Sequence, residues 1–203
     1  GNVGKRGAGL HPLRGQNNVQ GASDAGLIPM MYPDYQLVEK NNNKDFFEKF
    51  WDTPLDDKKG LTVVEIMDAI HENTIKGMYI LGENPAMSDP DLNHAREALQ
   101  MLDHLVVQDI FLTETATYAD VIFPASAWPE KNGTATNTNR QVQMGRKAIN
   151  APGDAKEDWW ITTELAKSLG LDWKYTHPKE VFNEMKLSMK SLNNISWERL
   201  ENE

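Results

Sequence analysis

The chain has 203 residues, which is long enough for one domain with a proper hydrophobic core. Its 21 basic and 30 acidic residues give a net charge of −9, and this balance argues against a nucleic-acid or membrane-surface partner. Because there is no cysteine, the chain itself holds no disulfide, no thiolate-bound iron–sulfur cluster and no cysteine nucleophile. The five histidines show no metal-ligand spacing, so no metal ligand is expected among them. No apolar run approaches the ~20 residues of a membrane-spanning helix.

Residues 1–35 are predicted to form polar and irregular loops. The glycine-rich run at 1–9 lacks a preceding strand, so it does not qualify as a dinucleotide fingerprint. Residues 13–26 follow, with the sequence LRGQNNVQGASDAG. Arg14 offers a rigid fork for an anion, the amides offer donors and acceptors, and the glycines allow close backbone approach. These residues suit a polar ligand site, and equally a surface loop rich in turn formers.

Helical spacing of apolar residues starts in the next part of the chain. Residues 44–51 place four aromatic side chains at helical spacing, which favours a short helix that packs them in a core. Thr62 is expected to cap a second helix, with Glu65 completing a capping box. The expected buried stripe of this helix consists of Val63, Val64, Ile66, Met67 and Ile70.

Short apolar runs alternate with helices between residues 78 and 123. Strands are expected at 78–81, 105–107 and 119–123, and a helix that begins at Asp89 or Pro90 separates the first two. Apolar strands of four or five residues that alternate with helices are typical of a buried parallel sheet. The predicted fold class is therefore α/β, a Rossmann-like and mostly parallel sheet with helices on both faces.

In such sheets ligands bind outside the carboxyl ends of the strands. The residues at these ends are polar or small, namely Gly82, Glu83, Asn84, Gln108, Asp109, Pro124, Ala125 and Ser126. The Asp109 carboxylate can accept two donors from a guanine edge or hold a ribose diol, and Gly82 lets a pyrophosphate approach the backbone. Two structural roles fit equally well: Asp109 caps the following turn, and Gly82 only relieves it.

The remaining third of the chain contains further loops and helices. Residues 130–143 are expected to form an extended loop on the ligand side, leading into a strand at 141–144. Arg140 can pair with a phosphate or with an internal carboxylate, and we expect the internal ion pair. A helix is expected at 154–170, where Asp158 in the first turn is favoured by the helix dipole alone. Two C-terminal helices complete the chain. We divide it into a loop region at 1–35, a dinucleotide-binding-like core at 60–175, and C-terminal helices at 176–203.

Several motifs in the same order resemble those of formate dehydrogenase alpha subunits, a branch of the molybdopterin oxidoreductases. They are RGQNNVQG from Arg14, GENP from Gly82, VVQDIFLTETATYADVIFPASAW from Val106, GTATN from Gly133 and EDWW from Glu157. The arginine motif is specific to the formate branch, whereas GENP and QDIF occur more widely in the family. The resemblance extends over essentially the whole chain.

The resemblance implies a role for particular residues. Arg14 would lie beside molybdenum and help hold formate, with Gly15 and Gln16 against the cofactor. The guanosine and pyrophosphate of one guanine dinucleotide would be lined by Gly82, Glu83, Asn84, Ser88, Gln108, Asp109 and Asp158. We include Ser126 in the same candidate site because it lies at the end of a predicted strand. The implied cofactor is molybdenum held by two molybdopterin guanine dinucleotides, of which this chain would provide a partial site. The implied reaction oxidises formate to carbon dioxide.

The resemblance also implies that residues 1–203 are a central portion of a larger cytoplasmic subunit. The molybdenum-ligating cysteine or selenocysteine and the iron–sulfur cluster would lie upstream, and another cofactor-binding domain downstream. The implied partners are these domains and electron-transfer subunits, and the portion alone should be inactive. Three alternatives stay open: another molybdopterin oxidoreductase, such as a nitrate reductase, a cofactor-free structural domain as in the large subunit of respiratory complex I, or a free-standing nucleotide-binding module.

Overall fold

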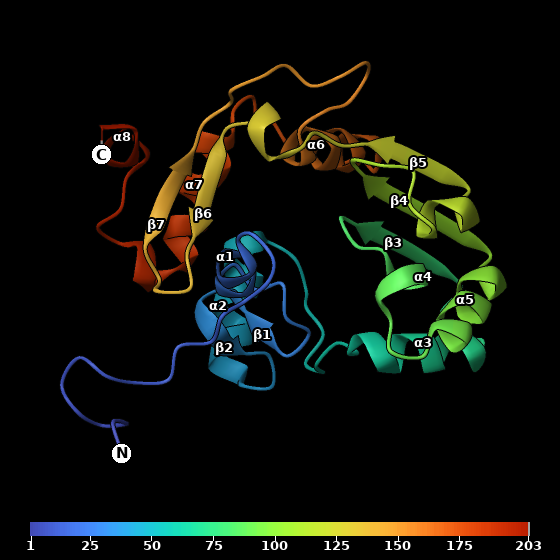
Figure 1. Ribbon diagram of the computed structural model, residues 1–203, viewed down its shortest axis with the longest axis horizontal. Coiled ribbons are helices and arrows are strands. Elements are labelled where there is room, and N and C mark those ends of the chain that lie inside the picture. The colour runs from blue at the N-terminus through green and yellow to red at the C-terminus, as the bar shows by residue number, and fades with distance from the viewer. Residues whose placement is uncertain (203) are drawn as a thin grey trace. The chain divides into compact units, whose positions relative to one another are not determined.

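The computed structural model describes residues 1–202, and the chain divides into two compact units. Unit 1 contains residues 1–60, 132–145 and 177–203, and unit 2 contains residues 61–131 and 146–176. Figure 1 shows the elements of both units. Within residues 1–202 we find no helix that could span a membrane.

Unit 2 is built on a three-stranded parallel sheet. Its strands are β3 (Gly77–Leu81), β4 (His104–Asp109) and β5 (Val121–Pro124), in the order β3-β4-β5 (Figure 1). Leu81 pairs with Gln108, which pairs with Phe123, so the carboxyl ends of all three strands lie at the same edge. This edge is where the sequence predicts ligand-binding residues.

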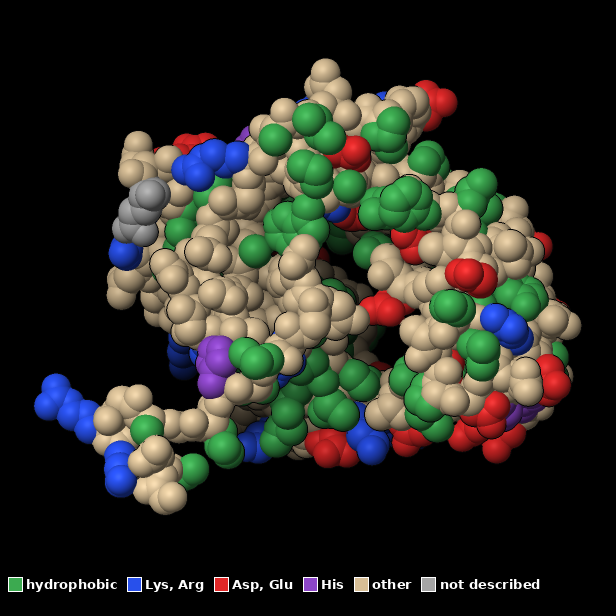
Figure 2. All heavy atoms as spheres, viewed as in Figure 1, with side chains coloured by type: hydrophobic (Ala, Val, Ile, Leu, Met, Phe, Trp, Pro, Cys, Tyr) green, Lys and Arg blue, Asp and Glu red, His purple; other side chains and the backbone are tan. Residues whose placement is uncertain are grey.

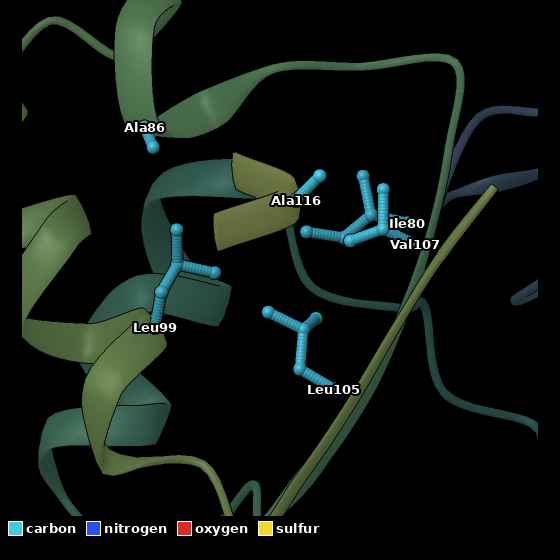
Figure 3. Close-up of a cluster of buried hydrophobic side chains, with 6 residues drawn as sticks. All are labelled: Ile80, Ala86, Leu99, Leu105, Val107 and Ala116. Atoms are coloured by element: carbon cyan, nitrogen blue, oxygen red, sulfur yellow. The ribbon is translucent and has the colours of Figure 1, made fainter. Parts of the chain in front are cut away.

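One face of this sheet packs against helices to form the core of unit 2. The helices are α3 (Val63–His71), α4 (Pro85–Ser88), α5 (Leu92–Met101) and the short η2 (Thr115–Tyr118). Figure 3 shows the central cluster, in which sheet side chains meet those of α4, α5 and η2: Ile80, Leu105 and Val107 with Ala86, Leu99 and Ala116. α3 packs beside α5 and starts with the predicted capping box between Thr62 and Glu65.

The opposite face contacts α6 (Asp158–Ser168), which follows the short η3 (Trp128–Glu130) in unit 2. Because side chains alternate along a strand, Gln108 and Phe123 lie on the face opposite to Val107. Gln108 bonds to Asp158 at the start of α6, and Phe123 lines a cavity of about 350 Å³ together with Ile161 and Leu165. Helices therefore contact both faces of the parallel sheet, which confirms the predicted fold class.

Unit 1 consists of short elements. They are α1 (Val19–Asp24), β1 (Met31–Tyr32), η1 (Pro33–Tyr35), β2 (Gln36–Leu37), α2 (Asn41–Trp51), β6 (Gly133–Thr136), β7 (Val142–Gly145), α7 (Pro178–Ser188), η4 (Lys190–Leu192) and α8 (Trp197–Asn202). β1 pairs with β2 and β6 with β7, both antiparallel. Phe47 of α2 is fully buried with Tyr32, and Phe182 and Trp197 centre a second core between α7 and α8.

Three local expectations were wrong. Val63 and Val64 are 53% and 56% exposed, because only the later turns of α3 reach the core. Residues 130–143 are not one extended loop, since 133–136 form β6 and pair with β7, a strand partner that periodicity cannot identify. The polar stretch 13–26 contains α1, in which Gln20 and Asp24 bond to each other one turn apart.

Element boundaries also shifted by a few residues. α6 begins at Asp158 and not at Asp154. α5 begins at Leu92, because the Asp91 side chain caps the helix by accepting a hydrogen bond from the His94 backbone N–H. The predicted end of α6 at Gly170 is confirmed, since Gly170 adopts the left-handed conformation that terminates helices.

Candidate functional site

The predicted site residues divide between the two units. Arg14, Gly15 and Gln16 belong to unit 1. The other predicted residues all belong to unit 2, where they lie at or just beyond the carboxyl ends of the parallel strands: Gly82, Glu83, Asn84, Ser88, Gln108, Asp109, Ser126 and, on α6, Asp158.

Gly82 turns the chain at the end of β3. It has φ +64°, a left-handed conformation that side chains with a Cβ rarely adopt, and its N–H donates to the Gln108 carbonyl at 2.9 Å. A Cβ added at this position would meet no atom within 4 Å. Glycine is therefore favoured at this turn, and the space above it is open.

A chain of polar side chains runs through the edge of the sheet from β3 to α6. Gln108 is completely buried, accepts a hydrogen bond from the Tyr79 hydroxyl, and donates from Nε2 to Asp158 Oδ1 at 2.7 Å. The second carboxylate oxygen of Asp158 is bound by the Lys131 ammonium, which also donates to the Ser126 carbonyl at 2.9 Å. A buried amide needs such partners, because an unpaired one would cost about 1–3 kcal/mol.

The surroundings of Tyr79 raise the pKa of its hydroxyl above the usual value. Burial is the larger cause, and the nearby negative charge of Asp158 adds to it. The hydroxyl therefore stays protonated at neutral pH and acts as a donor to Gln108.

The Asn84 side chain fastens the turn after β3 to η2. Its Oδ1 accepts from both the backbone N–H and the hydroxyl of Thr115, at 3.1 and 2.7 Å, and its Nδ2 donates to Glu114 at 2.7 Å. The bond from Asn84 lowers the pKa of Glu114, which stays ionised at neutral pH. The Ser88 hydroxyl donates to the Asn84 carbonyl at 3.1 Å. The Asn84 side chain of the GENP turn therefore has a structural role, because it holds the turn against residues 114 and 115.

Asp109 ends β4 and is partly exposed. Its Oδ1 accepts a hydrogen bond from the Ile110 N–H at 2.7 Å, so the carboxylate does cap the following turn. Three exposed apolar residues come next, Ile110, Phe111 and Leu112, which are 47%, 74% and 82% exposed. The capping role that the sequence suggested for Asp109 is present, and it uses Oδ1. A ligand would therefore bind to the other carboxylate oxygen, Oδ2.

Ser126 lies just beyond the end of β5 and is 1% exposed. Its backbone N–H and carbonyl are bound by Lys156 and Lys131, but no hydrogen-bond partner for its buried hydroxyl is found within residues 1–202. Glu83 and Ser88 are exposed and line a cavity of about 480 Å³ beside β3, whose other walls are mostly apolar, including Val63, Met67 and Leu81.

In unit 1, Arg14, Gly15 and Gln16 are exposed and lie outside helices and strands, directly before α1. Figure 2 shows the N-terminal segment that precedes them as an extension with exposed Lys and Arg side chains. The predicted internal pairing of Arg140 is confirmed: its Nη2 lies 3.3 Å from Asp24 Oδ1, and its guanidinium stacks over the Tyr35 ring at 5.8 Å. Arg140, Asp24 and Tyr35 also line a polar cavity of about 500 Å³.

Sequence reasoning did not select Lys131 or Tyr79. Lys131 is one of several lysines in polar segments, and Tyr79 is an aromatic residue in a strand with high β-propensity, so neither position is unusual in the sequence. Only the tertiary structure brings them together with Gln108 and Asp158.

The family model for molybdopterin oxidoreductase matches residues 1–168. The chain belongs to the molybdopterin oxidoreductase family. This confirms the family that the motifs predicted.

The relatives of this molybdopterin oxidoreductase chain include several formate dehydrogenases. It is 52% identical to the F420-dependent formate dehydrogenase subunit alpha of Methanocaldococcus jannaschii over 202 residues. The alignment covers 98% of this chain and 30% of the relative. It is 45% identical over 201 residues to a putative formate dehydrogenase of Bacillus subtilis, which is 99% of this chain and 20% of the relative. The resemblance to formate dehydrogenase alpha subunits is thus confirmed, and the chain spans less than a third of these relatives.

Among solved structures, the chain is similar to acetylene hydratase from Pelobacter acetylenicus. The TM-score is 0.58 with 22% sequence identity, over 69% of this chain and 20% of that one. At this identity the likeness supports the fold alone.

Proposed function

We propose that this chain is the part of a formate dehydrogenase alpha subunit that binds the guanosine and pyrophosphate portion of a molybdopterin guanine dinucleotide. The observation that supports it best is the polar edge of the parallel sheet in unit 2, where Gln108, Asp158 and Lys131 are bonded together beside Asp109. The 52% identity to a named formate dehydrogenase subunit supports the formate branch over other members of the family.

The residues at this edge fit the proposed cofactor portion. The buried Ser126 hydroxyl has no partner within residues 1–202, so it can donate to a ligand without losing a bond. The space above Gly82 is open, so a pyrophosphate could approach the backbone there. The Asp109 carboxylate can accept from the N–H groups of a guanine edge, and the Lys131 ammonium can balance phosphate charge. The proposed site consists of Gly82, Glu83, Asn84, Ser88, Gln108, Asp109, Ser126 and Asp158.

In this proposal Arg14 binds formate, with Gly15 and Gln16 against the cofactor. A guanidinium can hold both oxygens of a carboxylate in a fixed orientation and offset its charge. The molybdenum cofactor, when bound, supplies the two-electron oxidation of formate to carbon dioxide. The protein residues are responsible for holding and orienting the substrate.

The proposal places the rest of the enzyme outside this chain. An iron–sulfur cluster, the metal-ligating residue, the second dinucleotide-binding region and electron-transfer subunits would belong to the parent complex. The chain alone should not oxidise formate. The cytoplasmic location predicted from the resemblance stays a prediction.

The dinucleotide site is tested by titrating the chain with GDP in a calorimeter, with Asp109→Asn as the variant. The asparagine Oδ1 can still accept from the Ile110 N–H, so the turn is kept while the charge is lost. Because hydrogen bonds to a charged group contribute about 1.5–3 kcal/mol, we expect GDP affinity to fall roughly tenfold or more. Equal affinity in both proteins would refute the role of Asp109. No binding to the wild-type chain would leave the cofactor-free structural domain open, because a partial site can be too weak to hold GDP by itself.

The role of Arg14 is tested in the full alpha subunit. Arg14→Ala should lose most formate oxidation and keep its molybdenum content, because the guanidinium is proposed to bind substrate and not metal. Arg14→Lys should retain part of the activity, since an ammonium keeps the charge without the planar fork. Arg6→Ala, at an exposed arginine of the preceding N-terminal segment, is the matched control and should behave as wild type.

A further inference from the structure

We propose that Asn18 and the β6–β7 hairpin position Arg14 by holding both ends of the segment that contains it. This inference rests on the proposed role of Arg14 in binding formate. Arg14 lies in the six residues 12–17, which are outside helices and strands and exposed. His11 and Asn18 flank this segment, and both contact the same hairpin in unit 1.

The two contacts are with residues close together on the hairpin. On the N-terminal side, His11 Nε2 lies 3.1 Å from the Thr138 hydroxyl. On the C-terminal side, the Thr136 backbone N–H donates to Asn18 Oδ1 at 2.8 Å. The segment that contains Arg14 is thus a short bridge with both ends on one support, and closing a loop in this way reduces the positions that it can sample.

The backbone of Asn18 is in a conformation that few residue types tolerate. Asn18 has φ +61°, a left-handed conformation that asparagine tolerates better than most residues. Its side chain lies over the first turn of α1, where a Cβ at Gly21 would be only 2.0 Å from Asn18 Oδ1. Gly21 is therefore the residue that leaves room for the Asn18 amide, and both positions of the RGQNNVQG motif are explained by one contact.

The hairpin is itself fixed to α1. Arg140, between β6 and β7, pairs with Asp24, which is 6% exposed and also accepts from Gln20 Nε2 at 2.8 Å. Gln20 donates to the Tyr35 hydroxyl at 2.9 Å as well. The hairpin is therefore linked to α1 and its preceding residue by side chains at two points, Asn18 to Thr136 and Asp24 to Arg140, which restricts movement of one relative to the other.

A guanidinium must be well placed to bind a small anion, and displacement of about 1 Å can reduce kcat/KM by up to about a hundredfold. Asn18 is thus a positioning residue: it does not touch the substrate in this proposal, and it acts through Arg14. Its loss should weaken the binding of formate more than the later steps.

The test uses steady-state formate oxidation by the full alpha subunit in its complex. Asn18→Ala should raise the KM for formate about tenfold, with a smaller change in kcat and an unchanged molybdenum content. Asn18→Asp should restore most of the wild-type KM, because it keeps the Oδ1 acceptor for Thr136 and tolerates the left-handed conformation. Asn42→Ala, an exposed asparagine of α2, is the matched control and should have no effect.

A second pair of variants tests whether Asn18 acts through Arg14. In an Arg14→Ala background, Asn18→Ala should cause no further loss, since the residue that it positions is absent.

Thr138→Val removes the exposed hydroxyl that faces His11 with little risk to folding, and should raise the formate KM severalfold. This variant keeps the inference testable if Asn18→Ala does not fold.

The outcomes separate the inference from the function on which it depends. Wild-type KM values in both Asn18→Ala and Thr138→Val, or equal losses with and without Arg14, would overturn the positioning role. Full activity of Arg14→Ala would instead overturn the proposed role of Arg14 itself.

Discussion

The hydrogen bonds of Gln108 can be tested by replacing it with leucine. Gln108→Leu removes the acceptor of the Tyr79 hydroxyl and the donor to Asp158, at a position that is completely buried. The volume of the side chain is roughly kept, so the change is mainly in hydrogen bonding.

The expected magnitude follows from these contacts. The bond to the Asp158 carboxylate should contribute about 1.5 kcal/mol, the low end for a charged partner, because Asp158 keeps Lys131 and is partly exposed to water. The bond to Tyr79 should contribute about 1 kcal/mol, and the added apolar group of leucine should return about 0.8 kcal/mol. We expect the free energy of unfolding to fall by about 1.7 kcal/mol.

The assay is urea unfolding of Gln108→Leu, Tyr79→Phe and the double variant, followed by tryptophan fluorescence, since Trp159 and Trp160 lie on α6 beside the network. The double-mutant cycle should give a coupling energy of about 1 kcal/mol between Gln108 and Tyr79. A coupling near zero, or a Gln108→Leu variant as stable as wild type, would refute the energetic role of this network.

Three further predictions concern the same unit. Leu99→Ala, at a side chain 2% exposed in the cluster of Figure 3, should reduce the free energy of unfolding by about 3 kcal/mol in urea. Gly82→Ala should cost about 1–2 kcal/mol because of its left-handed backbone, whereas Gly82→Asn should cost less, and equal losses would contradict this reason. Since folding raises the pKa of Tyr79, its contribution to stability is present below pH 10 and is lost as the pH rises above it. The loss should be smaller in Tyr79→Phe, as alkaline unfolding curves would show.

The strands and most helices of unit 2 could be predicted from the sequence because their signals are local. Short runs such as 105–107 are apolar enough to be buried, and Thr62 with Glu65 satisfies backbone donors within one helical turn. The positions of Gly82, Gln108 and Asp109 at one edge follow from the same alternation of strands and helices, since parallel strands have their carboxyl ends together.

The division of the chain into units could not be predicted in the same way. Residues 132–145 interrupt unit 2 in sequence and cluster with unit 1, because β6 and β7 pair with each other and pack beside α1 and the C-terminal helices. Contacts between residues about 120 positions apart, such as Asn18 with Thr136, leave no periodic pattern in the sequence.

The sequence alone determined the family, the α/β class and the residues at the ends of the strands, because these depend on local patterns and on the order of short motifs along the chain. Only the tertiary structure decided how those groups are used. It showed that Asn84 fastens a turn, that Asp109 caps one, and that Lys131 and Tyr79 join Gln108 and Asp158. A side chain's hydrogen bonds depend on which distant segments fold against it, and burial makes each missing partner costly.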